Sequence, residues 1–296
     1  MTAALEQIAQ RPVAHPSAIS QVTAVEQSRA IAEVQAAVTV AQQCPRDLGR
    51  AIAEMRESCG RLALAQRAFY AVPNRGNGPS VFLARELARI WGNIDFGVKE
   101  LHRDDVAGTS EMLSYAWDMQ ANTRSGRSFI SPHQRMKKIN GTQVRERLVD
   151  LNDIYLSNQN TGARAVRETI LTVLPAWFSE EAQDICRRTL EHGEGEPLAE
   201  RIVKMVRAFA DRDITIAQLE AKVGRKRSAW TAGDVAEMAI AYTSVTRDGI
   251  PSAELFPVDR VNAEDITRQA RHSGKPASEE PSTDESGWPE TQQVAP

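Results

Sequence analysis

A block of basic residues lies in the middle of this 296-residue sequence, between Thr123 and Arg147. It contains one acidic residue, Glu146, and its net charge is +6. Lysine and arginine bind phosphate oxygens, and proteins hold single-stranded nucleic acid in a positive groove that follows the phosphates. The block therefore predicts a polyanion partner, although a run of charge is also typical of a solvated face. Its basic residues are Arg124, Arg127, Arg135, Lys137, Lys138, Arg145 and Arg147.

Other side chains near the block would complete such a site. Phe129 offers a ring on which a base could stack, and the alternative is a core position on its strand. Arg164 and Arg167 are three residues apart on an expected helix and follow the polar run 158–162. His133 lies among the cations, where we expect a phosphate contact rather than general-base chemistry. The predicted nucleic-acid-binding residues are Arg124, Arg127, Phe129, Arg135, Lys137, Lys138, Arg164 and Arg167.

The net charge of the whole chain, −3, hides this block. Residues 273–296 have a net charge of −4 and are rich in Ser, Pro, Thr and Gln. Such a composition cannot bury enough apolar surface to fold, so we predict a disordered acidic tail over 259–296. A tail of this charge would compete with nucleic acid for the block, and we expect deletion of residues 273–296 to tighten binding.

Little in the sequence resembles a catalytic site. The glycine-rich stretch 75–80 lacks the Lys-Ser/Thr pair of a phosphate-binding loop, so we expect a turn and a helix entry there. His102, Asp104 and Asp105 could bind a metal ion, and a metal-dependent nuclease is the corresponding alternative. Their place in an expected hairpin link favours turn chemistry instead. We therefore predict no enzyme and no cofactor, with a role for Mg²⁺ left open.

The three cysteines and the hydropathy indicate the cellular compartment in which we expect the protein. Cys44, Cys59 and Cys186 show no C-x-x-C spacing, which argues against a disulfide framework and a cysteine-based zinc site. No apolar run approaches the roughly 18 residues that cross a bilayer, and the first residues lack the apolar region of a secretory signal. We expect a cytoplasmic protein with no membrane partner.

The hydrophobic pattern of the chain predicts an α+β fold, with N-terminal helices, a small antiparallel β-meander packed on helices, and a helical C-terminal half. Residues 1–25 lack a clear period and are expected to form a flexible arm. A short strand is expected at 69–73. Helical spacing predicts helices at about 25–41, 47–65, 79–91, 151–174, 179–190, 198–210, 216–223 and 231–247.

Between residues 94 and 131 the period changes to two, which is typical of strands with one buried face and one polar face. We expect three strands, near 94–98, 113–120 and 127–131, with a polar link at 102–108. The third strand leads directly into the basic block. The apolar positions expected to form the buried face are Ile94, Phe96, Val98, Leu113, Tyr115, Trp117 and Met119.

Several stretches resemble phage RecT-like single-strand DNA annealing proteins, and together they span about residues 27–257. In the first half of the chain they are Gly78–Gly97, Tyr115–Asp118 and Asn158–Arg167. The C-terminal part is similar to the small helical module that ends many of those proteins, through Ile216–Gly224, Trp230–Thr231 and Tyr242–Gly249.

The resemblance implies a phage recombination factor that binds single-stranded DNA and anneals complementary strands without ATP. It implies homo-oligomeric rings or filaments, and a core in which a β-sheet and helices form a narrow basic groove. It also implies that the C-terminal module contacts a partner, such as a phage exonuclease or the host single-strand binding protein.

We divide the chain into an arm (1–25), a DNA-binding, annealing and oligomerisation core (26–212), a small helical module (213–258) and an acidic tail (259–296). The alternative function is that of a non-catalytic phage structural or adaptor protein, whose basic block binds an acidic partner.

Overall fold

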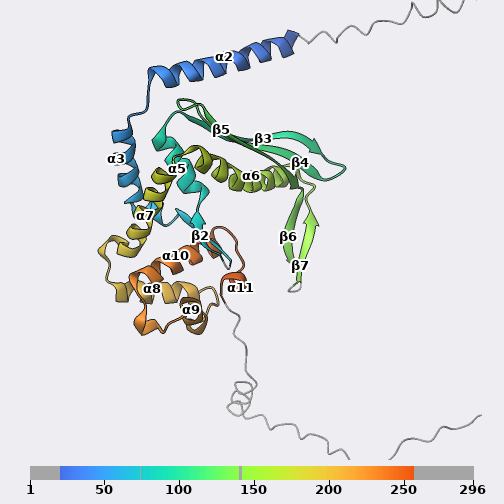
Figure 1. Cartoon of the computed structure of the whole chain (residues 1–296). Helices are drawn as coiled ribbons and strands as arrows, with labels where there is room; N and C mark the ends of the chain where they lie inside the picture. Colours follow the sequence, from blue (N-terminus) through green and yellow to red (C-terminus); the bar gives the residue numbers. More distant parts are fainter. Residues whose placement is uncertain (1–20, 74, 140–141, 257–296) are drawn as a thin grey trace, which may run out of the picture.

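The computed structural model describes residues 21–73, 75–139 and 142–256, and it confirms the α+β class (Figure 1). A three-stranded antiparallel sheet is surrounded by helices, and two smaller two-stranded sheets accompany it in the described ranges. The predicted acidic tail (259–296) lies outside these ranges, as do residues 1–20 of the predicted arm. Residues 21–25, which the sequence assigned to the arm, belong to a helix.

The first described helix, α2 (Gln21–Gln43), projects from the body and lies above the sheet in Figure 1. Its apolar spacing predicted one buried face, but Val25, Ile31 and Val34 are 57%, 60% and 46% exposed. Every residue from Ala24 to Ala36 is exposed, so this stretch has no partner surface within the described part of the chain.

The stretch 47–65 contains two helices rather than the predicted one, α3 (Leu48–Cys59) and α4 (Leu62–Ala65), separated at Gly60. The predicted short strand is confirmed as β1 (Phe69–Val72). The glycine-rich stretch is a strand rather than only a turn, because β2 (Gly76–Pro79) pairs with β1. Helix α5 (Val81–Trp91) follows, with Ser80 as its N-cap.

The predicted meander is confirmed as β3 (Ile94–Asp104), β4 (Thr109–Asp118) and β5 (Thr123–Pro132), in the order β3-β4-β5. The strands are longer than predicted: residues 102–104 of the expected link belong to β3, and 105–108 form the turn to β4. His102 and Asp104 of β3 pair with Glu111 and Thr109 of β4, beyond an irregularity in register between Glu100 and His102.

Helix α6 (Leu151–Val173) packs against one face of this sheet, which we call the inner face (Figure 1). Contact is close at Gly162, where an added Cβ would lie 2.9 Å from Val98 Cγ2. Buried Ser114 and Ala116 of β4 also face α6, and the Ser114 hydroxyl lies 3.1 Å from Thr169 Oγ1. Small side chains and hydrogen-bonded hydroxyls thus let the helix approach the sheet.

The basic block continues into a hairpin that the sequence did not predict, formed by β6 (Gln134–Ile139) and β7 (Thr142–Arg147). We call this hairpin the ribbon. It runs away from the three-stranded sheet beside the N-terminal end of α6 (Figure 1). Its base is attached through His133, whose amide donates to the Gly108 carbonyl and whose carbonyl accepts from the Leu148 amide.

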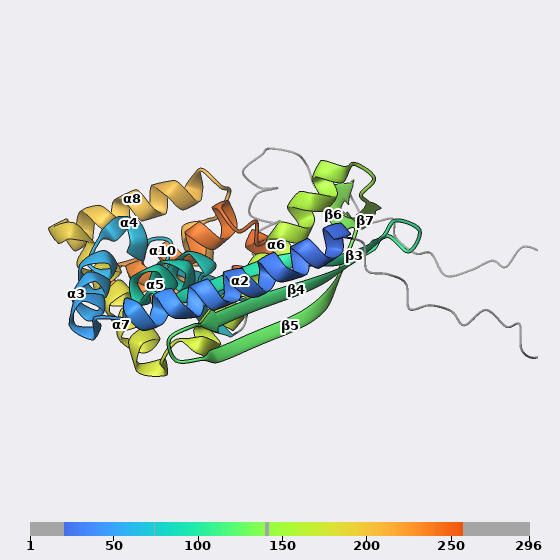
Figure 2. The same ribbon diagram turned by 90° about the horizontal axis from the view of Figure 1, so that it is seen from above.

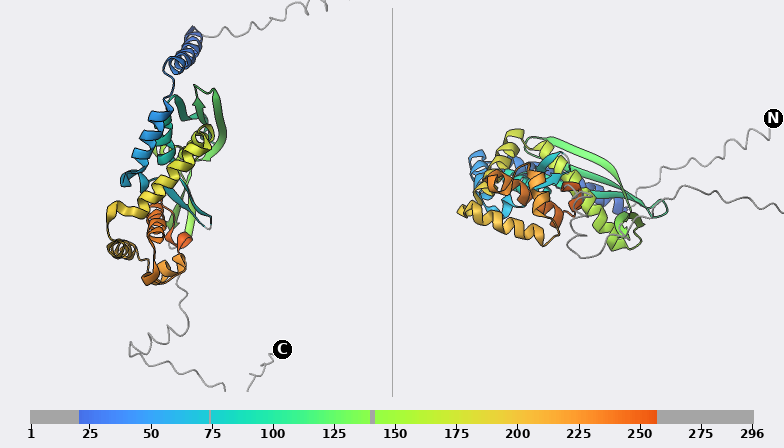
Figure 3. Two further views of the ribbon diagram at one scale, coloured as in Figure 1. Left: turned by 60° about the vertical axis from the view of Figure 1, so that its left-hand side comes forward. Right: turned by 90° about the horizontal axis from the view of Figure 1, so that it is seen from below.

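The described part of the C-terminal half is helical, as predicted. Its helices are α7 (Ala176–His192), α8 (Leu198–Ala210), α9 (Ile216–Val223), α10 (Ala232–Thr246) and α11 (Ser252–Leu255). Figures 2 and 3 show these helices gathered at the end of the molecule opposite the ribbon. None of the helices in the described ranges is long and apolar enough to cross a membrane.

Two hydrophobic cores lie within the described residues. The larger one joins α3, α5, α6 and α7 around Met55, Leu87 and Phe178. The smaller one joins α8 to α11 around Phe209 and Met238, and also includes Ala71 of β1. Phe209 precedes the predicted boundary at residue 212, so the smaller core includes more than the predicted C-terminal module.

Candidate nucleic-acid interface

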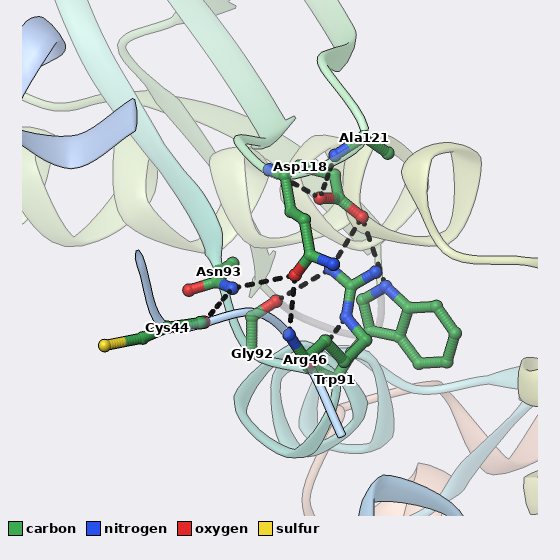
Figure 4. Close-up of polar contacts among 8 residues, drawn as sticks. Cys44, Arg46, Trp91, Gly92, Asn93, Asp118 and Ala121 are labelled. Atoms are coloured by element: carbon green, nitrogen blue, oxygen red, sulfur yellow. Dashed lines mark hydrogen bonds and ion pairs between the residues drawn. The ribbon is translucent and has the colours of Figure 1, made fainter. Parts of the chain in front are cut away.

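A buried ion pair fixes the three-stranded sheet to the N-terminal helices (Figure 4). Arg46 Nη2 lies 2.8 Å from Asp118 Oδ2, and the two side chains are 8% and 3% exposed. Arg46 also donates to the carbonyls of Trp91 and Gly92, and Trp91 Nε1 donates to Asp118. Asp118 Oδ1 accepts from the amides of the β4–β5 turn.

Trp91, Gly92, Asn93 and Asp118 belong to the stretches that carry the resemblance noted above. In the structure they hold the end of α5 against the β4–β5 turn, and Asn93 donates to the carbonyl of Cys44. Because this cluster is buried and its groups bond one another, its role here is to position the sheet rather than to contact a ligand.

A second buried cluster surrounds Ser110 at the other end of the inner face. Ser110 Oγ lies 2.7 Å from His133 Nε2 and 2.7 Å from Glu100 Oε1, and it accepts from Asn158 Nδ2 at 3.0 Å. Ser110, His133 and Asn158 are at most 2% exposed. The expectation of a phosphate contact at His133 is therefore wrong, because the ring is enclosed where the ribbon joins the sheet.

The predicted site residues of β5 point to opposite sides of the sheet. Arg124 is opposite Trp117 on the face that α6 does not cover, which we call the outer face. Arg127 is opposite the buried Ser114 on the inner face, yet its own side chain is exposed. Phe129 is half-buried on the inner face, opposite Met112, as the core interpretation of this residue required.

The predicted site residues of the ribbon are neutralised by acidic neighbours. Arg135 Nε lies 2.7 Å from Glu146 Oε2, and Lys137 Nζ lies 3.0 Å from Glu146 Oε1. Arg135 Nη1 is also 3.3 Å from Asp153 Oδ2 at the start of α6. Hydrogen bonds from Arg135 and Lys137 lower the pKa of Glu146 below its ordinary value. Lys138 lies on β6, but its side chain is outside the described set.

On α6 the two predicted arginines have different surroundings. Arg167 is partly buried, with its guanidinium carbon 4.5 Å from the ring centroid of Tyr70 and an ion pair to Glu168. Arg164 is exposed and has no ion pair among the residues that the structure describes. The structure therefore separates the predicted set into exposed cations on β5 and α6, paired cations on the ribbon, and the packed Phe129 and Arg167.

The prediction of which face of β4 is buried was wrong for Leu113 and Tyr115, whereas Trp117, which shares their face, is buried as predicted, at 8% exposed. Met112, Ser114 and Ala116 are buried against α6, whereas Leu113 and Tyr115 lie on the outer face and are half-buried. The register explains this result, because Val98 is opposite Ser114 and Gly97 is opposite Tyr115. The apolar residues of β3 thus share a face with the small residues of β4.

The sequence prediction therefore missed an aromatic and basic group on the outer face, formed by Lys99, Tyr115 and Trp117. Lys99 Nζ lies 4.9 Å from the Tyr115 ring centroid, and Arg124 Cζ lies 3.9 Å from that of Trp117. Both distances are typical of cation–π contacts. The glycines opposite Tyr115 were the available signal, since an aromatic side chain beside two glycines often lies flat over them.

One acidic residue of the possible metal cluster, Asp104, has a structural role. Asp104 Oδ1 accepts hydrogen bonds from the amides of Val106 and Ala107, so it forms the β3–β4 turn. This agrees with the turn chemistry favoured by the sequence. In the described ranges, no group of three or more His, Cys, Asp and Glu side chains is placed to hold a metal ion.

Comparison of the chain with protein-family models, with curated proteins and with solved structures finds no match.

Proposed function

We propose that this chain binds single-stranded DNA and anneals complementary strands without ATP, as the resemblance to RecT-like proteins implies. The same proposal includes assembly into a ring or filament on DNA in the cytoplasm of a phage host. It also assigns to residues 213–258 the contact with a partner such as an exonuclease or a single-strand binding protein.

One observation carries the proposal: Arg124, Arg127 and Arg164 are exposed and unpaired with acid in the described chain. Two of them lie on β5, an edge strand of the sheet, and the third lies on α6, which packs against β5. A cation without an acidic partner binds phosphate without first breaking an ion pair. These arginines are thus the best available contacts for a phosphate backbone.

The mechanism follows from charge and geometry. Arginines along β5 and α6 would hold the backbone, and the rigid sheet, locked by Arg46 and Asp118, would keep them at fixed spacing. A strand held by its phosphates keeps most base edges free to pair with a complement. Binding would release counterions, so the affinity would fall steeply as salt is raised.

The test compares single-stranded DNA binding by the full chain and by a variant with Arg124→Gln, Arg127→Gln and Arg164→Gln. The dissociation constant of a labelled oligo-dT is measured over a range of salt concentrations. We expect weaker binding and a log-log salt slope reduced by about 2, since each lost contact to a single strand removes about 0.7.

A matched control replaces three other exposed arginines, Arg50, Arg85 and Arg188, which also have no ion pair among the described residues. This variant loses the same charge from α3, α5 and α7. Equal weakening in the two variants would show that net charge alone acts, and would contradict the proposed site. Absence of any binding by the unmodified chain would favour the adaptor function instead.

A further inference from the structure

The outer face of the three-stranded sheet has an unusually flat centre. Tyr115 is flanked in register by Gly97 on β3 and by Gly126 on β5. A Cβ added to Gly97 would lie 3.0 Å from Tyr115 Oη, so the ring lies over the glycine. The lack of side chains on both neighbours leaves the phenol ring as the surface of the sheet at this point.

Two cations accompany the aromatic rings of this face. The Lys99 ammonium lies 4.9 Å from the centroid of Tyr115, and the Arg124 guanidinium carbon lies 3.9 Å from that of Trp117. Lys99 and Arg124 are both exposed. Arg124 is therefore seated on Trp117 and accessible to a further planar group.

No second layer of the described chain covers the middle of this face. Gly126 and Ser128 of β5 are exposed. Helix α2 runs above the sheet in Figures 1 and 2; its residues from Ala24 to Ala36 are all exposed, and of its described side chains only those at the C-terminal end, where Ala41 is buried, pack on the body. The face is thus accessible to a ligand.

We propose that this outer face is a stacking platform for the bases of a single-stranded nucleic acid. One base stacks on the guanidinium of Arg124 above Trp117, because bases stack on arginine planes as well as on aromatic rings. A second stacks on Tyr115 once Lys99 moves away from the ring. This inference rests on the proposed function and adds Lys99, Tyr115 and Trp117 to its site.

The positions of the rings determine how the strand is held. Tyr115 and Trp117 are two residues apart on β4, which separates them by about 6.8 Å. That distance is about twice the 3.4 Å spacing of stacked bases along one strand of a duplex. Successive bases on the two stacks therefore cannot remain stacked on each other, so the strand is extended.

Charge places the backbone of that strand along β5. The outer face also carries two carboxylates, Asp95 opposite Trp117 and Glu111 opposite Ile130. These repel phosphates from β3 and from the far end of β4. Arg127 and the in-plane N–H groups of Arg124, which remain free when a base stacks on its guanidinium face, make β5 the basic edge, so phosphates follow β5 while the bases extend over β4.

The test uses two oligonucleotides of equal length and charge, oligo-dT and its abasic counterpart, with the full-length protein. Loss of stacking costs about 1–3 kcal/mol per base, so each stacked base should make the unmodified chain bind oligo-dT about 5- to 150-fold more tightly than the abasic strand. Tyr115→Leu should reduce this ratio, and Tyr115→Phe, which keeps the ring, should restore it. Thermal unfolding checks that each variant is folded.

Tyr155→Leu is the matched control, because Tyr155 is 54% exposed on α6, away from the outer face. It should leave the ratio unchanged. Equal binding of the two oligonucleotides by the unmodified chain would overturn the platform and leave the proposed function in place. A Tyr115→Leu ratio equal to that of the unmodified chain would do the same, and binding of neither strand would overturn both proposals.

Discussion

Arg46 and Asp118 form a buried ion pair, 2.8 Å long, that connects the segment between α2 and α3 to the end of β4. The Arg46 guanidinium also lies 4.2 Å from the ring centroid of Trp91. Asp118 in turn bonds the amides of Gln120 and Ala121. This pair therefore fixes the β4–β5 turn, and with it the strand that presents Arg124 and Arg127.

Replacement of Asp118 by alanine should destabilise the protein strongly. It leaves the Arg46 cation buried without its counterion, which costs about 3–5 kcal/mol. Urea unfolding should show this loss, whereas Asp105→Ala, in the exposed β3–β4 turn, should change the free energy of unfolding by less than about 0.5 kcal/mol. A cost for Asp118→Ala as small as that of the control would mean that the pair does not hold the sheet.

Gly162 is required by close packing rather than by a ligand. An alanine there would place its Cβ against Val98, and overpacking of this kind costs about 1–3 kcal/mol. Unfolding of Gly162→Ala should show that loss, and Val98→Ala in the same chain should recover part of it. Stabilisation by about 0.5–1 kcal/mol, the intrinsic helical gain of alanine over glycine, would contradict the packing role.

The stabilising effect of the cluster at Ser110 should depend on pH, because it depends on the ionisation of Glu100. A hydrogen bond from Arg103, assisted by Ser110 and the charge of His133, lowers the pKa of Glu100 below its ordinary 4.5. Its stabilising effect is thus fully present above pH 4.5 and is lost as the pH falls through the lowered pKa of the folded state.

Glu100→Gln should therefore lose less stability than the unmodified chain when urea midpoints are followed downward from pH 4.5. Glu200→Gln, an exposed site on α8, is the control and should follow the unmodified profile. Parallel acid profiles for Glu100→Gln and the unmodified chain would show that this carboxylate has no special role.

A substitution in the ribbon should tighten DNA binding, whereas loss of the exposed arginines should weaken it. Glu146 pairs with both Arg135 and Lys137, so Glu146→Gln would release Lys137 and leave Arg135 paired with Asp153 alone. If the ribbon contacts the strand, binding should tighten and the salt slope should steepen by about 0.7, the contribution of one further phosphate contact. Glu57→Gln, which releases Arg61 on the body, controls for net charge. The ribbon has no part in the site if the two variants bind alike.

The sequence alone predicted much of the fold, because local signals were strong. Helical spacing placed the C-terminal helices, and alternation placed the three strands of the meander. The ribbon was missed because a surface hairpin with charged residues on both strands has no apolar alternation to detect. The pairing of β2 with β1 was also missed, because its residues, Gly76–Pro79, are typical of turns.

The candidate site was harder to predict because it depends on register. Alternation marked Tyr115 and Trp117 as one face but could not say that this face lies away from α6. The pairing of Val98 with Ser114, both of which contact α6, determines that. Likewise, counting charge gave the basic block correctly, but not the ion pairs that Glu146 and Asp153 form with its ribbon residues.

The most direct measurement is the rate at which two labelled complementary strands form a duplex with the full chain present and ATP absent. The unmodified chain should raise this rate well above that of the strands alone. The Arg124, Arg127 and Arg164 variant should not raise it, and the Arg50, Arg85 and Arg188 variant should act like the unmodified chain. A rate with the unmodified chain equal to that of the strands alone would contradict the annealing function.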